Sequence, residues 1–375
     1  MSKATSPEVM KQNNKKAILE FIYSEKNIYR AQIADRTRLS NQTVTNLVKE
    51  LKEQGFIKEV TMETKGKGRN PIALSIALEN LCAIGVEISV QGVTVGVYDA
   101  QGEVINREDH PPTDVILPIL KTMLENALAK AGDRKVLGIA MSLEGVINES
   151  TGLVVKSSLG LDGVNLIKEL KYLGVKTYIR NDVNLLAETS NRQEENYMMV
   201  LFDRGIGAAL FLNGAVLRSD HNMAGEFGHS IIYSNPHPRQ CKCGKMGCLT
   251  TEASMSAIED RFHMSVLEVA KAYKAEDPEI FPEIERLCRY IAEPMANMIT
   301  IMDLEKVLVT GSLVELMGPS FLECIHRNIK ERLSVWNSFK GVEVLDHYDI
   351  ADLSAKFVVE KYFLRWRNGG AISKK

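Results

Sequence analysis

Residues 225–248 read GEFGHSIIYSNPHPRQCKCGKMGC, a stretch that places a histidine near its start and three cysteines in its last eight positions. Cys241, Cys243 and Cys248 stand among glycine and lysine, whereas structural cysteines usually lie among apolar residues. Thiolate sulfur and imidazole nitrogen are the ligands that tetrahedral Zn²⁺ prefers, and glycines allow a short loop to fold around one ion. The stretch therefore predicts a structural zinc site.

The fourth ligand is not fixed by spacing. His221, His229 and His237 all lie close enough along the chain to compete for that position. The alternative interpretation is that the cysteines are ordinary reduced thiols in a loop, which their metal-knuckle spacing disfavours.

The composition of the whole chain is that of a soluble globular protein, with 45% hydrophobic and 25% charged residues. Its 375 residues predict two or three folding units. The sequence has neither a signal-like start nor an apolar run long enough to cross a bilayer, which predicts no membrane partner. Six cysteines are too few for a disulfide framework, so we expect a reduced, cytoplasmic protein with Cys82, Cys288 and Cys324 in its core.

Charge is distributed unevenly along the chain. Residues 1–72 contain 14 Lys and Arg against 8 Asp and Glu, a net charge of +6, whereas the remainder carries −8 and the total is −2. A basic N-terminal unit joined to an acidic body indicates a nucleic-acid partner at one end of the chain.

Three helices are predicted in the N-terminal unit. Apolar residues fall mostly at helical spacing over residues 9–23, a short helix fits residues 30–37, and Ser40 is a good N-cap for a third helix that runs to about Gln54. Gly55 then terminates the third helix, and residues 56–60 are predicted to form a strand.

The third helix has the pattern of a recognition helix. Its apolar stripe leaves amides, hydroxyls and one ammonium facing outward, groups that read base edges and hold phosphates in the major groove. The alternative is a solvated helix face without a partner, but such a face usually mixes Glu with Lys, and the N-terminal half of this one lacks acids. The candidate DNA-binding residues are Asn41, Gln42, Thr43, Thr45, Asn46 and Lys49.

Lys67 and Arg69, within a Gly-rich basic run that ends at Pro71, suit a β-wing that contacts the DNA backbone or minor groove. The three helices, the strand and this run together resemble a winged helix-turn-helix, which we place at residues 1–72. Recognition helices of this type act in pairs on two-fold symmetric operators, so we expect a homodimer or higher homo-oligomer on double-stranded DNA.

The rest of the chain alternates short apolar runs with helical patterns and glycine-rich turns, which predicts an α/β body of two lobes. The expected strands are residues 82–90, 93–98, 136–141, 177–180, 198–202 and 208–211, and the expected helices are residues 115–131, 166–173, 183–191 and 283–302.

Four motifs of this body, read in order, resemble those of the ROK family. They are Asn181-Asp182-Val183-Asn184, Gly205-Ile206-Gly207, Glu226-Phe227-Gly228-His229, and the run from Cys241 to Cys248. Members of that family are sugar kinases and sugar-responsive repressors with an actin-like, hexokinase-like fold. The resemblance implies a sugar-sensing ROK domain of two lobes over residues 80–375 with a zinc loop at 229–248. A winged helix in front of it is similar to the family's repressor branch, which includes repressors of xylose use.

The resemblance also assigns roles to residues. It implies that Asn181 and Asp182 hold sugar hydroxyls, that Asp182 would be the general base if the protein were a kinase, and that Glu226 contacts the sugar. It favours His229 as the fourth metal ligand and implies that this histidine also reaches the sugar through its second ring nitrogen. The ordinary alternative for the Asn-Asp pair is a helix cap.

The departures from the family pattern concern ATP. Where kinases of the family begin the body with DxGGT, residues 87–92 read EISVQG, and bulky residues there would obstruct the close approach of a phosphate. Arg204 replaces the Thr of the second phosphate loop and follows Asp203, and Thr310-Gly311-Ser312 replaces consecutive glycines. The sequence therefore predicts a protein that is not an enzyme.

The sugar side departs as well. Thr250 stands where the family usually has Glu, and Glu252 follows two positions later as a candidate effector ligand. Ser142-Leu143-Glu144-Gly145 stands where many members have Gly-Pro-Gly.

Three functions follow, in decreasing order of support. The first is a DNA-binding regulator, expected to be a repressor of carbohydrate-use genes, that senses a sugar or sugar derivative and contains structural Zn²⁺. The second is an ATP-dependent sugar kinase that carries a DNA-binding domain. The third is a regulator that answers to a protein partner instead of a sugar.

Overall fold

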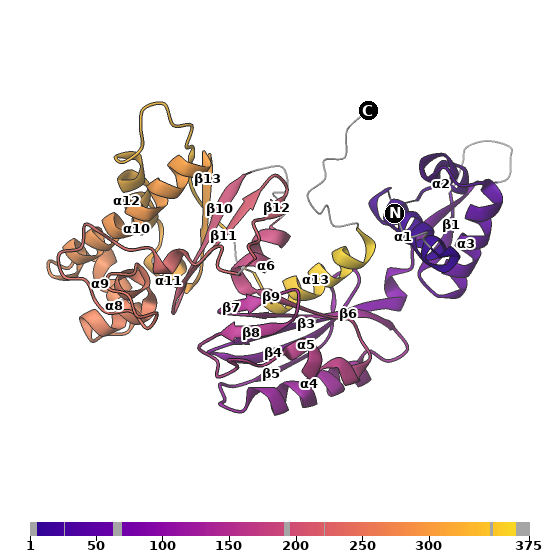
Figure 1. Ribbon diagram of the computed structural model, residues 1–375, viewed down its shortest axis with the longest axis horizontal. Helices are drawn as coiled ribbons and strands as arrows, with labels where there is room; N and C mark the ends of the chain where they lie inside the picture. Colours follow the sequence, from indigo (N-terminus) through magenta and orange to yellow (C-terminus); the bar gives the residue numbers. More distant parts are fainter. Residues whose placement is uncertain are drawn as a thin grey trace. The chain divides into compact units, whose positions relative to one another are not determined.

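The computed structural model (Figure 1) describes residues 6–25, 27–62, 70–190, 196–220, 222–345 and 348–364. These residues form two compact units. One contains the chain up to Arg180 and the helix that follows Asp349, and the other runs from Asn181 to Tyr348. The chain therefore passes from one unit to the other twice.

The N-terminal part of the first unit has the element order of a winged helix-turn-helix, as predicted. Strands β1 and β2 pair antiparallel after three helices. In chain order the elements are α1 (Pro7–Glu25), α2 (Arg30–Thr37), α3 (Asn41–Glu53), β1 (Ile57–Thr61) and β2 (Ile72–Ile76).

Helix α3 begins where the sequence predicts, because the side chain of Ser40 accepts a hydrogen bond from the backbone N–H of Thr43 at 3.1 Å. Each aliphatic side chain buried along its inner face contributes about 1.5–3 kcal/mol. That face consists of Val44, Leu47, Val48 and Leu51.

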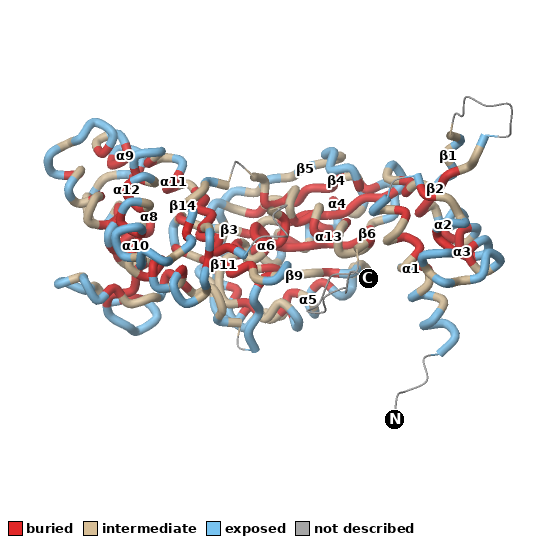
Figure 2. The backbone as a smooth tube through the Cα atoms, turned by 90° about the horizontal axis from the view of Figure 1, so that it is seen from above, coloured by how far each residue is buried: buried red, intermediate tan, exposed pale blue. Residues whose placement is uncertain are grey.

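The body of the first unit is built on a five-stranded sheet of order β5-β4-β3-β6-β9, in which β3 pairs antiparallel with β4 and parallel with β6. Strands β3, β4 and β6 are buried along most of their length (Figure 2). The strands are β3 (Leu81–Ser89), β4 (Gly92–Asp99), β5 (Val104–His110), β6 (Lys135–Leu143) and β9 (Thr177–Asn181).

Two helices pack on this sheet. Helix α4 (Ile116–Lys130) lies against β4 and β5, and α13 (Ile350–Phe363) lies against β3 and β6. Gly85 in β3 permits the approach of α13, because a Cβ there would lie 1.7 Å from the carbonyl oxygen of Ala351. The last element of the chain is thus held against the central strand of the first unit.

Helix α13 also contacts the winged helix. The ring of Phe363 stacks on Tyr23 with centroids 4.9 Å apart, and the ring of Tyr362 stacks on Phe56 at 5.6 Å. The Nζ of Lys135, at the start of β6, lies 4.0 Å from the centroid of Phe56. Aromatic stacking and a cation–π contact therefore attach the N-terminal helices to the body within one unit.

The second unit contains a five-stranded sheet of order β12-β11-β10-β13-β14. Strand β10 pairs antiparallel with β11 and parallel with β13. The strands are β10 (Tyr197–Phe202), β11 (Ile206–Leu212), β12 (Ala215–Val216), β13 (Lys306–Thr310) and β14 (Gly341–Val344).

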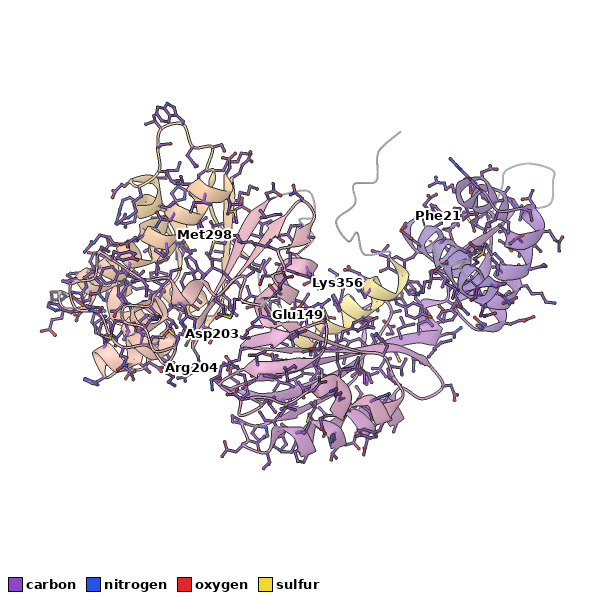
Figure 3. The ribbon with its side chains drawn as sticks, in the orientation of Figure 1. Phe21, Glu149, Asp203, Arg204, Met298 and Lys356 are labelled. Atoms are coloured by element: carbon purple, nitrogen blue, oxygen red, sulfur yellow. The ribbon has the colours of Figure 1, made fainter. Side chains whose placement is uncertain are left out.

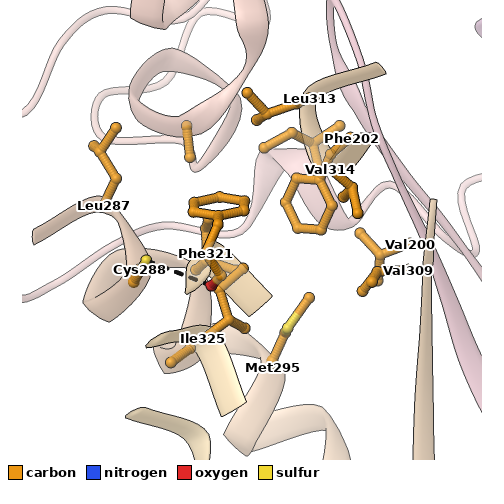
Figure 4. Packing of buried hydrophobic residues seen from close by; sticks show 14 of the residues in the cluster. Val200, Phe202, Leu287, Cys288, Met295, Val309, Leu313, Val314, Phe321 and Ile325 are labelled. Carbon is orange, nitrogen blue, oxygen red and sulfur yellow. Dashed lines mark hydrogen bonds between the residues drawn. The ribbon is translucent and has the colours of Figure 1, made fainter. Parts of the chain in front are cut away.

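Long helices α10 (Ile280–Met302) and α12 (Pro319–Lys330) pack together in the core of the second unit. Figure 4 shows this core, in which the thiol of Cys288 lies 3.9 Å from the carbonyl oxygen of Phe321. Cys82, Cys288 and Cys324 are all buried, as predicted.

Shorter elements complete the two units. They are η1 (Leu78–Asn80), β7 (Val146–Asn148), β8 (Leu153–Lys156), α5 (Leu166–Glu169), η2 (Lys171–Leu173), α6 (Asp182–Thr189), η3 (Phe227–His229), α7 (Thr250–Ala253), α8 (Met255–Phe262), α9 (Val266–Lys274) and α11 (Ser312–Met317).

The predicted α/β architecture is confirmed, and every strand and helix expected in the body is present within a few residues. One boundary differs: the helix expected over residues 166–173 divides into α5 and the 3₁₀ turn η2, which ends at left-handed Gly174. No helix among the described ranges is both long and apolar enough to cross a membrane.

Candidate functional site

The predicted metal ligands meet in the second unit. The ligand atoms of His229, Cys241, Cys243 and Cys248 all lie within 4.8 Å of one another. The sulfurs of Cys243 and Cys248 are 3.6 Å apart, and the sulfur of Cys241 is 3.5 Å from Nδ1 of His229. A tetrahedral site with Zn–S bonds of about 2.3 Å has edges of about 3.8 Å. The donor set and its spacing therefore fit one tetrahedral metal ion.

Glycines bring the histidine of this cluster into place. A Cβ on Gly225, whose φ is +95°, would lie 2.1 Å from the carbonyl oxygen of Ala208, and a Cβ on Gly228 would lie 2.3 Å from that of Ile206. Both contacts are with β11, so the segment can lie directly against this strand only without side chains at these positions. The 3₁₀ turn η3 then carries His229 toward the cysteines.

A tight turn presents the cysteines. The backbone N–H of Cys241 donates to the carbonyl of Lys245 at 2.8 Å, and that of Gly244 donates to the carbonyl of Cys241 at 2.9 Å. The N–H of Leu249 donates to the carbonyl of Ser230 at 2.9 Å, which returns the chain beside the histidine segment. Local backbone hydrogen bonds therefore close the loop around the four ligands.

Two of the cysteines lie in different environments. A backbone hydrogen bond from Lys245 lowers the pKa of Cys243, whereas burial raises the pKa of Cys248 to about 12. A buried thiol with a raised pKa stays protonated at neutral pH unless positive charge compensates, and a coordinating metal ion supplies that charge and deprotonates the thiol.

Of the other two candidate histidines, the one that the structure describes does not join this cluster. His237 is exposed, and its backbone N–H donates to the side chain of Asn235 at 3.1 Å. His221 lies outside the described residues. Of the three candidates, His229 is the one that the described structure brings to the cysteines.

The second nitrogen of His229 faces Glu226. Its Nε2 lies 3.8 Å from a carboxylate oxygen of Glu226, while Nδ1 faces Cys241. Burial raises the pKa of Glu226 above its usual value, and His229 partly offsets that rise. The ring is thus oriented with one nitrogen toward the metal ligands and the other toward the predicted sugar ligand.

Asn181 and Asp182 begin helix α6. The Oδ1 of Asn181 accepts hydrogen bonds from the backbone N–H groups of Val183 and Asn184 at 3.1 and 3.2 Å. Asp182 accepts from the N–H of Val183 at 2.8 Å. Both side chains are half-buried, and the helix-cap geometry considered as an alternative to the sugar role is present.

Glu252 lies in a different setting from the other predicted effector ligands. Its side chain is 2% exposed, and its carboxylate is bound by Arg239 at 3.3 Å and by Arg261. Arg239 also donates to the carbonyl of Thr251. Both carboxylate oxygens have cationic partners, so this geometry gives no support to the effector role and instead ties the zinc loop to α7 and α8.

A carboxylate of the chain itself occupies the turn that resembles a phosphate loop. Asp203 and Arg204 lie between β10 and β11 (Figure 3). One oxygen of Asp203 accepts hydrogen bonds from the hydroxyl of Ser312 at 2.9 Å and from its backbone N–H at 3.4 Å. Arg204 pairs with Glu259 at 3.1 Å. Negative charge at the first turn of α11 disfavours a phosphate there.

Two further predicted departures lie in the first unit. The run of residues 87–92 comprises the end of β3, the tight turn at residues 90–91 and the start of β4, where Ser89 pairs with Gly92. Ser142, near the end of β6, is fully buried, and the carboxylate of Glu144, just after this strand, accepts a hydrogen bond from Ser158.

The recognition helix presents the predicted polar face. Along α3 residues Asn41, Gln42, Thr45, Asn46 and Lys49 are exposed, and Thr43 is half-buried. The first turn carries no acidic residue. Lys67 and Arg69, the candidate wing residues, lie outside the described residues.

Sequence reasoning missed two residues of the second unit that shape these sites. They are Arg239 and Tyr348. Burial raises the pKa of Tyr348 to about 12, and the charges of Asp182 and Asp203 add to the rise, so these acids share one neighbourhood. No local pattern marks such residues, because their partners are distant in sequence.

Comparisons with known proteins match two family models to different parts of the chain. A family model described as the ROK family matches residues 83–347, and one described as the MarR family matches residues 13–68. The chain is 26% identical over 350 residues to the DNA-binding transcriptional dual regulator NagC of Escherichia coli (strain K12), with 85% of this chain and 86% of the relative covered. It is 28% identical over 361 residues to the xylose repressor of Caldicellulosiruptor bescii, with 86% and 89% covered.

Solved structures share the fold. A ROK family transcriptional regulator homologous to the E. coli MLC protein superposes with a TM-score of 0.80 at 23% identity, covering 94% of this chain and 96% of that one. The ROK hexokinase of Thermus thermophilus superposes with a TM-score of 0.63 at 21% identity, covering 74% and 97%.

Proposed function

The chain belongs to the ROK family, and from that premise we propose that it is a sequence-specific DNA-binding transcriptional regulator that represses carbohydrate-use genes and responds to a sugar or sugar derivative. The observation that carries the proposal is the exposed, acid-free polar face at the start of α3, within a winged helix in front of a ROK body. Relatives along most of the chain are named as regulators of this kind, one a xylose repressor.

The effector site proposed here belongs to the second unit. Asn181, Asp182, Glu226 and His229 supply amide, carboxylate and imidazole groups, which match the vicinal hydroxyls of a sugar. Glu252 is left out of this set because both of its carboxylate oxygens are already bound by arginines.

The metal proposed for the four-ligand cluster is Zn²⁺, held by His229, Cys241, Cys243 and Cys248. With four protein ligands the ion would have no coordination position open to water or substrate, so it would be structural. It would fix the tautomer and the orientation of His229 beside Glu226, and thereby organise the effector site.

Control by the effector requires that two states of the protein bind it differently. A sugar releases the operator only to the extent that its affinity is higher for the state that binds DNA poorly. A coupling of about 1–3 kcal/mol, typical of allosteric proteins, changes operator affinity roughly 5- to 150-fold. The proposal includes a homodimer or higher homo-oligomer on two-fold symmetric DNA in the cytoplasm.

No specific observation favours the kinase alternative. A general base at Asp182 gains little without groups that hold and orient the nucleotide phosphates. The carboxylate of Asp203, bound to Ser312, repels phosphate at one of the turns that resemble phosphate loops. Sugar-dependent ATP turnover that Asp182→Asn abolishes would reverse this assignment.

The test is a selection of genomic fragments from the source organism by the purified, zinc-loaded, full-length protein. We expect retained fragments to contain a two-fold symmetric site upstream of carbohydrate-use genes. The substrates of the enzymes that those genes encode are then the sugars to test as effectors. Failure to enrich any sequence at moderate salt contradicts the DNA-reading function.

A further inference from the structure

Two amide side chains on the exposed face of α3 are joined to each other. The Nε2 of Gln42 donates a hydrogen bond to Oδ1 of Asn46 at 3.1 Å, one helical turn away. Both side chains are exposed. Their neighbours Thr43 and Thr45 are engaged locally, since Thr43 shares a hydrogen bond with Ser40 at 2.8 Å and Thr45 donates to the carbonyl of Asn41 at 2.8 Å.

This bond determines which groups of the pair remain for a ligand. With the amide orientation of the structure, Gln42 retains Oε1 and one N–H, an adjacent acceptor and donor. Asn46 has committed its oxygen to Gln42 and retains N–H donors. An acceptor beside a donor is the pattern that complements adenine, whose major-groove edge offers the N6 donor and the N7 acceptor.

We propose that Gln42 and Asn46 act as one preorganised recognition unit, in which Gln42 binds an adenine edge through two hydrogen bonds and Asn46 holds the Gln42 side chain in position. This inference rests on the proposed DNA-binding function and specifies which base the helix reads. Asn46 donates one of its two N–H groups to an acceptor on the neighbouring base pair. Because a free glutamine side chain loses rotamer freedom on binding, a partner that restrains it beforehand reduces that loss.

The rest of the helix surface agrees with adenine rather than guanine. Guanine presents two acceptors, which an arginine or lysine reads with two donors. Helix α3 contains no arginine, and its exposed Lys49 lies 3.9 Å from Glu53 toward the end of the helix, three residues beyond Asn46. Lys49 is therefore assigned to a phosphate.

A purely structural role would give the pair a different signature. A surface hydrogen bond between residues one turn apart stabilises a helix slightly and carries no base preference. Loss of such a bond would weaken binding to all DNA sequences alike, whereas loss of a base contact changes the preference at one position.

The test begins with selection from a random double-stranded DNA library by the full-length wild type, by Gln42→Ala and by Asn46→Ala. We expect the wild type to require an A·T pair at one position of each half-site and Gln42→Ala to lose that preference alone, by roughly 5- to 150-fold, the value of one bidentate base contact. Asn46→Ala should weaken the preference at the Gln42 position as well as at the neighbouring one, because the restraint on Gln42 is gone.

Two controls make the outcome decisive. Replacing the selected adenine by 7-deazaadenine removes the N7 acceptor, so it should weaken the wild type and leave Gln42→Ala unaffected. Lys49→Ala should lower affinity for every sequence and reduce the salt slope by about one, without changing base preference.

The inference is overturned if Gln42→Ala keeps the wild-type preference at every position, or if the position that it relaxes is a G·C pair in the wild-type site. A wild type that enriches no sequence contradicts the DNA-binding function itself, and the inference with it.

Discussion

Two regions of the second unit differ in the chemical groups that they present. One is the loop with the four candidate metal ligands, and the other is the turn between β10 and β11, which resembles a phosphate loop. At the loop, four ligand atoms lie within 4.8 Å of one another, and glycines allow the close approach that the arrangement requires. At the turn, the chain has placed its own carboxylate, Asp203, against Ser312. The loop thus presents the donor set of a metal site, while the turn presents a carboxylate where a phosphate-binding loop would offer hydrogen-bond donors.

Metal removal should produce the largest effect and would test the first half of this comparison. With free Zn²⁺ at roughly a thousand times its Kd, the ion adds about 4 kcal/mol to the free energy of unfolding. We expect chelation to lower the Tm of the wild type and to leave the already lowered Tm of Cys248→Ser unchanged. His237→Ala is the matched control, because this histidine lies outside the cluster and its variant should respond to Zn²⁺ as the wild type does.

Glu252→Gln should come next in size, because it removes the buried carboxylate charge that Arg239 and Arg261 share, although Arg261 keeps Glu283 at 3.3 Å. Loss of hydrogen bonds between charged groups costs about 1.5–3 kcal/mol. Chemical denaturation measures the loss, and Glu259→Gln, which disrupts a pair with half-exposed Arg204, should cost less than about 1 kcal/mol. A loss of effector binding by Glu252→Gln at unchanged stability would show that Glu252 is an effector ligand.

Asp203→Asn would sharpen the second half of the comparison. The variant keeps a hydrogen-bond acceptor for Ser312 but removes the negative charge, so the stability loss should be about 1–2 kcal/mol. We expect no sugar-dependent ATP turnover from the wild type or the variant, since residues 87–92 also lack the consecutive glycines of a phosphate loop. A coupled assay for ADP across a panel of sugars measures this, and turnover by the wild type would show that the carboxylate does not exclude the nucleotide.

The smallest expected effect concerns pH and the winged helix, which lies outside both regions and serves as a reference for them. Hydrogen bonds from Lys52 and Arg30 lower the pKa of Glu59 below its usual value. The stabilisation is therefore present above the unfolded-state pKa, near 4.5, and is lost as pH falls through the lower folded-state value.

Glu59→Gln should thus lower stability by about 0.5–1 kcal/mol at neutral pH and reduce the loss of stability between pH 5 and 3. Unfolding followed by circular dichroism at several pH values measures the difference. Equal acid sensitivity in both proteins would remove Glu59 from this role.

Local patterns made the winged helix and the ligand cluster predictable. The apolar stripe and Ser40 N-cap of α3 lie within one helix, and three of the four metal ligands lie within eight residues. The choice of His229 over two other histidines needed the family resemblance, because spacing did not decide it.

Long-range pairing explains what the sequence did not reveal. Strands β13 and β14 and helix α13 were not predicted, because their hydrophobic patterns are short or mixed. Contacts with distant segments define them: β13 pairs with β10, β14 pairs with β13, and α13 packs on β3. The burial of Glu252 depends on arginines 13 and 9 residues away, and the Asp203–Ser312 contact spans 109 residues. A sequence motif can indicate that such a residue lies near a site, but it does not reveal which group of the protein binds its side chain.

The stacking of α13 on the winged helix has a consequence for biosynthesis. Phe56 leaves the ribosome early, but Tyr362, the ring on which it stacks, is among the last described residues to be made. At translation rates of about 5–20 residues per second, the N-terminal helices are complete roughly 15–60 s before α13 is made. During that interval the aromatic stacking that attaches these helices to α13 does not yet exist.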